Sequence, residues 1–179
     1  APTDDPAAPA AGAAAPDKAA LFKALEVKAD LMALGVDRLD YTKGILERLR
    51  GLERCLERFP DLLGRLCLVQ IAAPRRARLD ADQRFGTEVD GEVERINRKF
   101  QSKGWRPVAY LKRHHSHAEI LPYVQAADVC LVTSLHDGMN LVAKEFIAAR
   151  QDEDGVLILS RFTGAARELR DALLVNPYD

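Results

Sequence analysis

Two basic side chains lie in the stretch VDRLDYTKGI, residues 36–45, where an apolar run gives way to a helical pattern. Arg38 carries a planar guanidinium that can bind two phosphate oxygens, and Lys43 adds a single mobile charge. Gly44 follows, and a helix is expected from Ile45, whose free N–H groups and dipole would favour an anion. The stretch therefore indicates a phosphate site, although it matches no Walker-type signature. Surface pairing of the two cations with the neighbouring aspartates is the alternative.

A second candidate is SLHDGMNLVAKEF, residues 134–146, where a polar turn separates an apolar run from a helical pattern. Gly138 permits a positive φ or the close approach of a ligand. Asn140 suits the N-cap of a helix that starts at Leu141. Glu145 lies one turn further along the same face, where its carboxylate could accept hydrogen bonds from two vicinal hydroxyls. A plain helix start with a surface glutamate is the alternative interpretation.

Two further loops carry charged or metal-binding residue types. AAPRRARLD, residues 72–80, holds three arginines and is either a positive patch suited to a phosphorylated substrate or a solvated basic loop. KRHHSHAE, residues 112–119, places three histidines within four positions. No cysteine or carboxylate cluster accompanies these histidines, so we expect no metal site. A polar loop that enters a helix at Ser116 or His117 is the favoured interpretation.

The composition indicates one globular domain. The chain has 179 residues, 47% of them apolar, which supports one core of ordinary size. Its 26 basic and 27 acidic side chains give a net charge of −1, so no overall field favours nucleic acid or an anionic membrane. The apolar runs are shorter than the roughly 20 residues of a membrane span, and the N-terminus does not resemble a secretory signal. We therefore expect a cytoplasmic protein whose three scattered cysteines are ordinary thiols.

The elements that must position these loops alternate along the chain. Residues 1–16 are rich in alanine and proline and are expected to form a flexible linker, so that the domain spans residues 17–179. Apolar runs predict strands at 31–36, 66–72, 107–111, 129–133, 156–159 and 173–175. Periodic patterns predict helices at 17–28, 45–59, 88–100, 117–128, 141–150 and 164–172. This alternation is typical of an α/β, Rossmann-like parallel sheet with helices on both faces, which binds ligands where its strands end.

Taken together, the motifs resemble the trehalose-6-phosphate synthase family of retaining glucosyltransferases. The resemblance rests on VDRLDYTKGI, ERINRKF, SLHDGMNLVAKEF and the closing LLVNPYD, in this order and spacing, and it covers about residues 31–179. The family implies a GT-B fold, in which two Rossmann-like domains face each other and the C-terminal one holds the donor nucleotide. The chain looks like that C-terminal half. We therefore expect the N-terminal acceptor domain to be absent and the isolated chain to be inactive.

The resemblance also implies roles for single residues. Arg38 and Lys43 match the pair that grips the donor diphosphate and acts in catalysis, and Asp137 matches the acid that binds hydroxyls of the transferred glucose. Glu145 matches the glutamate that holds the ribose hydroxyls, and Arg76 is the best match to the arginine that reaches the acceptor phosphate. The backbone that approaches the sugar and the phosphates is expected at Gly138, Met139, Asn140 and Leu141.

Two loops depart from the family pattern. Arg78 stands where family members usually carry an acidic residue, and His115 and His117 do not keep the residue types of the loop that contacts uracil. The resemblance implies UDP-glucose and glucose 6-phosphate as substrates, with no cofactor and no metal ion. A related transferase with another acceptor such as glycerol 3-phosphate, or a non-catalytic nucleotide-sugar-binding module, are the alternatives. Self-association into a homo-oligomer is allowed.

Overall fold

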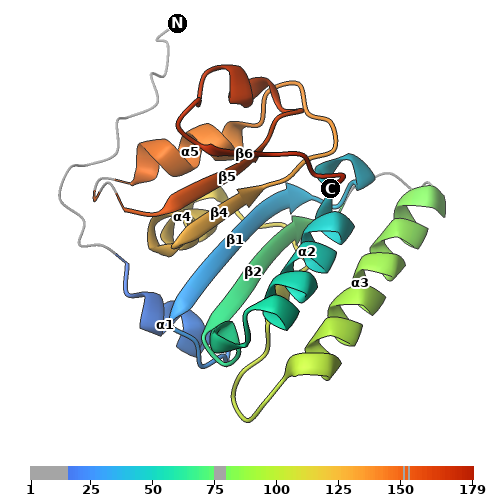
Figure 1. Cartoon of the computed structure of the whole chain (residues 1–179), viewed down its shortest axis with the longest axis vertical. Coiled ribbons are helices and arrows are strands. Elements are labelled where there is room, and N and C mark those ends of the chain that lie inside the picture. Colours follow the sequence, from blue (N-terminus) through green and yellow to red (C-terminus); the bar gives the residue numbers. More distant parts are fainter. Residues whose placement is uncertain (1–15, 75–79, 151, 153) are drawn as a thin grey trace, which may run out of the picture.

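The computed structural model describes residues 16–74, 80–150, 152 and 154–179, so the predicted linker lies outside the described residues except for Pro16. The described residues form a six-stranded sheet with the order β3-β2-β1-β4-β5-β6, in which every neighbouring pair is parallel (Figure 1). The strands are β1 (Leu31–Arg38), β2 (Leu66–Ala73), β3 (Val108–Leu111), β4 (Val129–Val132), β5 (Val156–Ser160) and β6 (Leu173–Val175). Each strand lies within two residues of its predicted bounds, so the predicted Rossmann-like sheet is confirmed.

Helices cover both faces of the sheet. They are α1 (Lys18–Ala24), α2 (Ile45–Arg58), α3 (Asp80–Phe100), α4 (His117–Ala126) and α5 (Leu141–Ala149), with short 3-10 turns η1 (Tyr41–Lys43), η2 (Pro60–Leu62) and η3 (Gly164–Arg167). α2 and α3 pack together on one face, whereas α4 packs against α1 and α5 on the other (Figure 1). The strand order reverses between β1 and β4, and in such sheets the ligand crevice lies at the carboxyl ends of these two strands. None of the described helices is both long and apolar enough to span a membrane.

The spacing of apolar residues explains why α2 forms and where it ends. Its buried stripe, which joins the core of the domain, consists of Ile45, Leu46, Leu49, Leu52 and Leu56. The predicted stripe also included Phe59, but the helix ends at Arg58 because Pro60 disfavours helical backbone in the residue before it. Phe59 consequently turns outward and is 55% exposed.

The last predicted helix is largely wrong. Of residues 164–172, only Gly164–Arg167 is helical, as the 3-10 turn η3. The first two N–H groups of this turn donate to the carbonyls of Asp137 and Met139, at 3.0 and 2.9 Å. These bonds fix the turn against the loop after β4, and the chain must then reach β6 within a few residues, which leaves no length for an α-helix.

An ion-pair network on the surface joins α2 to α3. Glu53 accepts hydrogen bonds from Arg95 Nη1 at 2.9 Å and from Lys99 Nζ at 2.7 Å. The hydrogen bonds from Arg95 and then from Lys99 outweigh the effect of burial and lower the pKa of Glu53 to about 2. Glu53 therefore contributes to holding the two helices together only while its carboxyl is ionised.

Glu53→Gln is expected to lower the thermal midpoint at neutral pH and to have less effect in acid. The folded pKa of Glu53 lies below its ordinary value of 4.5, so the contribution to stability is present above that value and is lost as the pH falls toward 2. Thermal melts of both proteins from neutral pH to about pH 2.5 test this expectation, with the exposed Glu94→Gln as control. A midpoint difference that stays constant over this range would contradict it.

Candidate functional site

The loop from β1 to α2 forms the first part of the candidate site. The side chain of Asp40 accepts the N–H of Thr42 at 2.9 Å and caps η1, and Gly44 then turns the chain into α2 with a φ of 67°. A Cβ at Gly44 would lie 2.2 Å from the carbonyl oxygen of Thr133. Glycine is therefore needed both for the positive φ and for the close approach. The turn brings the N-terminus of α2 against the end of β4.

The loop from β4 to α5 is tied to this first loop by main-chain bonds and by one ion pair. The carbonyl of Thr42 accepts the N–H groups of Leu135 and His136, at 2.8 and 3.3 Å. Lys43 Nζ donates to Asp137 Oδ2 at 2.6 Å, and both side chains are only 14% exposed. Two residues that were predicted for one site, 94 positions apart in sequence, are thus in direct contact.

The carboxylate of Asp137 is held by several donors. Besides Lys43, it accepts a hydrogen bond from Asn140 Nδ2 at 3.1 Å and a longer one from the N–H of Met139 at 3.4 Å. Burial raises the pKa of this carboxyl, but the hydrogen bond and charge of Lys43, together with Asn140 and Met139, leave the pKa below its ordinary value. Asp137 is therefore ionised at neutral pH, and its oxygens are fixed in direction.

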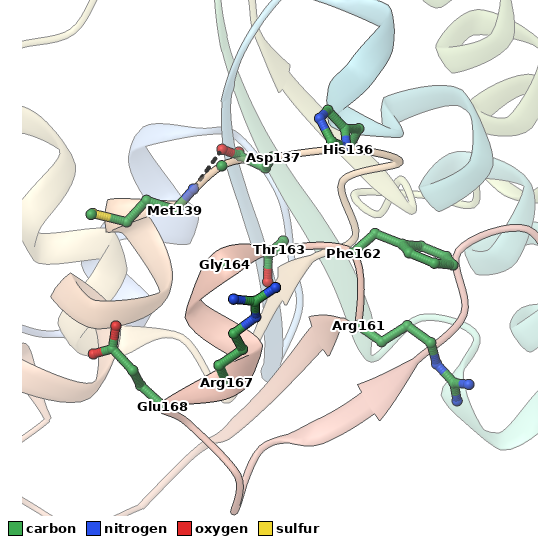
Figure 2. Close-up of a pocket in the computed structure, with 10 residues that line it drawn as sticks. His136, Asp137, Met139, Arg161, Phe162, Thr163, Gly164, Arg167 and Glu168 are labelled. Carbon is green, nitrogen blue, oxygen red and sulfur yellow. Dashed lines mark hydrogen bonds between the residues drawn. The ribbon is translucent and has the colours of Figure 1, made fainter.

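A third loop, which follows β5, lines the other side of an open pocket of about 740 Å³ (Figure 2). Asp137 donates its N–H to the carbonyl of Phe162 at 3.2 Å, and its own carbonyl accepts the N–H of Gly164 at 3.0 Å, so the two loops run side by side. The pocket is lined by His136, Asp137, Gly138, Met139, Arg161, Phe162, Thr163, Gly164, Arg167 and Glu168. Figure 2 shows the guanidinium of Arg167 turned toward Thr163, whereas that of Arg161 points away from the centre.

The start of α5 confirms part of the sequence prediction. Asn140 is the N-cap, because its side-chain oxygen accepts the N–H of Ala143 at 3.2 Å. A positive φ was one of two reasons offered for a glycine at position 138, and this prediction is wrong. The residue of this loop with a positive φ is Asn140, where φ is 70°. The other reason, the close approach of a ligand, fits the structure, because a Cβ at Gly138 would meet no atom within 4 Å. The space beside Gly138 is therefore open to a ligand.

Four other predicted residues have exposed side chains around these loops. Arg38 ends β1, Met139 and Leu141 lie at the start of α5, and Glu145 lies one turn into this helix. Within the described part of the chain, neither Arg38 nor Glu145 forms an ion pair or a side-chain hydrogen bond, so both are available to a ligand. Arg76, predicted to reach an acceptor phosphate, lies outside the described residues.

A buried network beneath the two loops was not predicted from the sequence. Surface pairing of Asp37 was the alternative interpretation of its loop, but its Oδ2 binds Arg48 Nη1 at 2.5 Å, and both side chains are almost fully buried. Arg48 also donates to Gln70 Oε1 at 2.7 Å and to Thr133 Oγ1 at 3.1 Å. A signal was present in the sequence, because helical spacing places Arg48 on the buried stripe of α2.

The loop after β5 was missed in the sequence analysis, whereas the histidine loop before α4 was predicted correctly. The loop after β5, which supplies Arg161 and Arg167 to the pocket, was missed, although the strand-end rule that selected the other loops applies to it equally. The histidine loop enters α4 as predicted, with Ser116 as the N-cap in a capping box with Glu119. Among the residues that the structure describes, no group of three or more His, Cys, Asp or Glu side chains could hold a metal ion.

Sequence comparisons match nearly the whole chain. The family model described as Glycosyltransferase family 20 matches residues 12–179. The trehalose-6-phosphate synthase of Enterobacter sp. (strain 638) is 44% identical over 177 residues, which cover 98% of this chain and 37% of that protein. The trehalose-6-phosphate synthase of Mycobacterium avium (strain 104) is 46% identical over 162 residues, covering 88% and 33%. The chain thus spans about a third of the length of these relatives.

Solved structures lead to the same group of proteins. An alpha,alpha-trehalose-phosphate synthase (UDP-forming) from Burkholderia xenovorans, in complex with glucose-6-phosphate, matches with a TM-score of 0.83 and 43% identity over 89% of this chain and 35% of that chain. The E. coli protein bound with UDP-2-fluoro glucose matches with a TM-score of 0.81 and 42% identity, over 90% and 36%. The fold is therefore that of one part of these larger GT-B proteins.

Proposed function

Because the chain belongs to glycosyltransferase family 20, we propose that it is the donor-binding part of a retaining glucosyltransferase. The proposed reaction moves glucose from UDP-glucose to glucose 6-phosphate and forms trehalose 6-phosphate and UDP. Two similar structures support this choice of substrates, since one is a complex with glucose-6-phosphate and the other is bound with UDP-2-fluoro glucose. In this proposal residues 17–179 form the donor domain, and a second domain supplies most contacts to the acceptor.

The observation that carries the proposal is the contact between Lys43 and Asp137. It joins the RLDYTKG loop to the DGMN loop at the carboxyl ends of β1 and β4, where the strand order of the sheet reverses. Ligands bind at this point in open α/β sheets. A cation for the diphosphate and an acid for sugar hydroxyls are therefore adjacent, as a ligand that joins a sugar to a diphosphate requires.

The chemical task proposed for this domain is to stabilise a leaving group. In a retaining transfer through an oxocarbenium-like ion pair, the bond from glucose to the diphosphate breaks while the acceptor hydroxyl attacks from the same face. The negative charge that grows on the diphosphate would be bound by Arg38, Lys43 and the N-termini of α2 and α5. No carboxylate nucleophile is needed, in contrast to retaining glycosidases. Side chains supply the positive charge, so the proposal includes neither a metal ion nor a cofactor.

The remaining contacts are proposed from the resemblance and fit the exposure of the residues. Asp137 would accept hydrogen bonds from hydroxyls of the transferred glucose, and the open space beside Gly138 would admit the sugar close to the backbone. Glu145, which is exposed and forms no ion pair in the described part of the chain, would hold the ribose hydroxyls. Arg76 is proposed to bind the phosphate of the acceptor.

Titration of the chain with UDP tests the donor site. We expect calorimetry to detect binding by this chain alone, without transfer of glucose, because the acceptor contacts are assigned to another domain. Glu145→Ala should weaken UDP binding about tenfold, the loss expected when hydrogen bonds to a charged group are removed. Glu94→Ala, on the exposed surface of α3, is the control. Unchanged affinity in Glu145→Ala would remove the ribose assignment, and absence of UDP binding by the wild-type chain would contradict the donor role.

An acceptor assay addresses the other half of the proposal. In a protein that contains both domains, we expect release of UDP from UDP-glucose to require glucose 6-phosphate. Release with glycerol 3-phosphate instead would identify a related transferase with another acceptor. Binding of UDP-glucose without transfer to either compound would indicate a binding module.

A further inference from the structure

We propose that Arg48 is a positioning residue of the donor site, which holds the loop of Lys43 and the loop of Asp137 at a fixed separation. This role rests on the proposed function, since it specifies what sets the geometry of that site. Arg48 contacts no ligand in this proposal. It acts through main-chain and side-chain groups at the bases of the two loops.

The guanidinium of Arg48 joins four segments of the chain. The residue lies on α2 and is 4% exposed. Its Nη1 donates to Asp37 Oδ2 on β1 and to Gln70 Oε1 on β2, at 2.5 and 2.7 Å. Its Nε donates to Thr133 Oγ1 at 3.1 Å, and its Nη2 lies 3.4 Å from the carbonyl oxygen of Lys43. One side chain thus links β1, β2, the end of β4 and the loop before α2.

A buried ion pair such as Arg48–Asp37 contributes little net stability to a fold. Apolar side chains of similar volume are often at least as stable, because the desolvation of two charges offsets their attraction. The chain nevertheless leaves room for the network at Gly35, where a Cβ would lie 2.4 Å from Gln70 Oε1 and 2.5 Å from Arg48 Nη1. Gln70 Nε2 also donates to Asp37 Oδ2 at 3.1 Å, which closes the network. A fully satisfied polar network favours one arrangement of its members over others.

The network reaches the candidate site at two points. Thr133 is the first residue after β4, and its carbonyl oxygen packs against Gly44 at the start of α2. Lys43 immediately precedes Gly44, and its carbonyl is the acceptor for Arg48 Nη2. One rigid guanidinium therefore holds the first loop at the carbonyl of Lys43 and the second at the hydroxyl of Thr133. With those starting points fixed, Lys43 Nζ and Asp137 Oδ2 meet at 2.6 Å.

Arg48→Lys tests this role, because lysine keeps the charge but replaces a planar fork with a single ammonium group. We expect the variant to bind UDP about tenfold more weakly than the wild-type chain. Arg150→Lys is the matched control, since Arg150 is also nearly buried and its Nη1 donates to the carbonyls of Gln125 and Ala127, at 2.7 and 2.5 Å. These carbonyls precede β4, at the opposite edge of the sheet from the loops. The control should lose stability and keep its UDP affinity.

Two measurements separate positioning from stability alone. In a Lys43→Ala background, Arg48→Lys should change the Kd for UDP less than about twofold, because the proposed effect is on the contact between Lys43 and Asp137, which this background already lacks. In the absence of ligand, an NMR titration should show the pKa of Asp137 rising toward its ordinary value in Arg48→Lys, because Lys43 is no longer held against the carboxylate. If Arg48→Lys does not fold, the Kd for UDP in both backgrounds and the pKa of Asp137 can be measured in Thr133→Val, which removes only the Oγ1 acceptor.

The outcomes distinguish this role from the proposed function. Unchanged UDP affinity in Arg48→Lys, an equal loss in both backgrounds, or an unchanged pKa of Asp137 would overturn the positioning role. If the wild-type chain binds no UDP while the pKa of Asp137 still rises in Arg48→Lys, the donor function fails and the positioning of the two loops stands.

Discussion

Lys43→Ala is expected to lower the turnover of an enzyme that contains this chain by about two orders of magnitude, which corresponds to roughly 3 kcal/mol. The ammonium of Lys43 is held by Asp137 at the carboxyl ends of β1 and β4, so it is in place before the leaving diphosphate develops its charge. A preorganised donor of this kind stabilises the transition state more than the ground state. The loss should therefore appear in kcat, measured as UDP release at saturating UDP-glucose. Arg38→Ala should behave in the same way.

Lys18→Ala is the matched control for Lys43→Ala. Lys18 Nζ also pairs with an aspartate, at 2.7 Å from Asp128 Oδ1, and Asp128 accepts the N–H of Met32 at the start of β1. This second pair lies at the amino edge of the sheet, away from the loops of the site, so its removal should leave kcat unchanged. Turnover close to that of the wild type in both Arg38→Ala and Lys43→Ala would contradict the mechanism.

Gly164→Ala is expected to lower the free energy of unfolding by about 3 kcal/mol and to reduce UDP affinity. A Cβ at Gly164 would lie 2.0 Å from the carbonyl oxygen of Gly138 and 2.9 Å from its carbonyl carbon. Both atoms belong to the main chain, so no side-chain rotation can relieve the conflict. The loop after β4 must then move, and the Lys43–Asp137 pair moves with it. Urea unfolding and calorimetric titration with UDP measure the two effects.

Gly51→Ala is the corresponding control. Gly51 is exposed within α2, and a Cβ there would meet no atom within 4 Å. Alanine should stabilise the helix by roughly 0.5 to 1 kcal/mol, because it restricts the unfolded chain more than glycine does. Equal effects of Gly51→Ala and Gly164→Ala on stability would show that the contact between the two loops is not tight.

The fold was largely predictable because its signals are local. Each strand is a largely apolar run, and the central ones are buried on both faces, such as β2, in which all residues from Cys67 to Ala72 are buried. Loop positions then followed from the rule that ligands bind where parallel strands end, and this rule brought Lys43 and Asp137 to one edge. η3 could not be predicted in the same way, because its length depends on hydrogen bonds to the loop after β4 rather than on its own sequence.

The candidate site was predicted where residue type and strand ends agreed, and was missed where a charge is buried. Arg48 was given no role from the sequence, and Asp37 was considered only as a possible surface partner of a cation, because charged side chains usually face solvent. Only the packing shows that Gln70 and Thr133 complete their hydrogen bonds. A positive φ was likewise considered for Gly138 and not for Asn140, two residues later, since glycine is the residue that adopts positive φ most easily.

The three loops of the site are held together mainly by bonds between main-chain atoms. Thr42 binds Leu135 and His136 in this way, and Asp137 and Met139 bind the first two residues of η3. Such bonds do not depend on which side chain a position carries, so the shape of the pocket should tolerate most replacements along these loops. Replacements that change the shape of the pocket should be concentrated instead at positions such as Gly44 and Gly164, where the main chain of one loop leaves no space for a side chain on another.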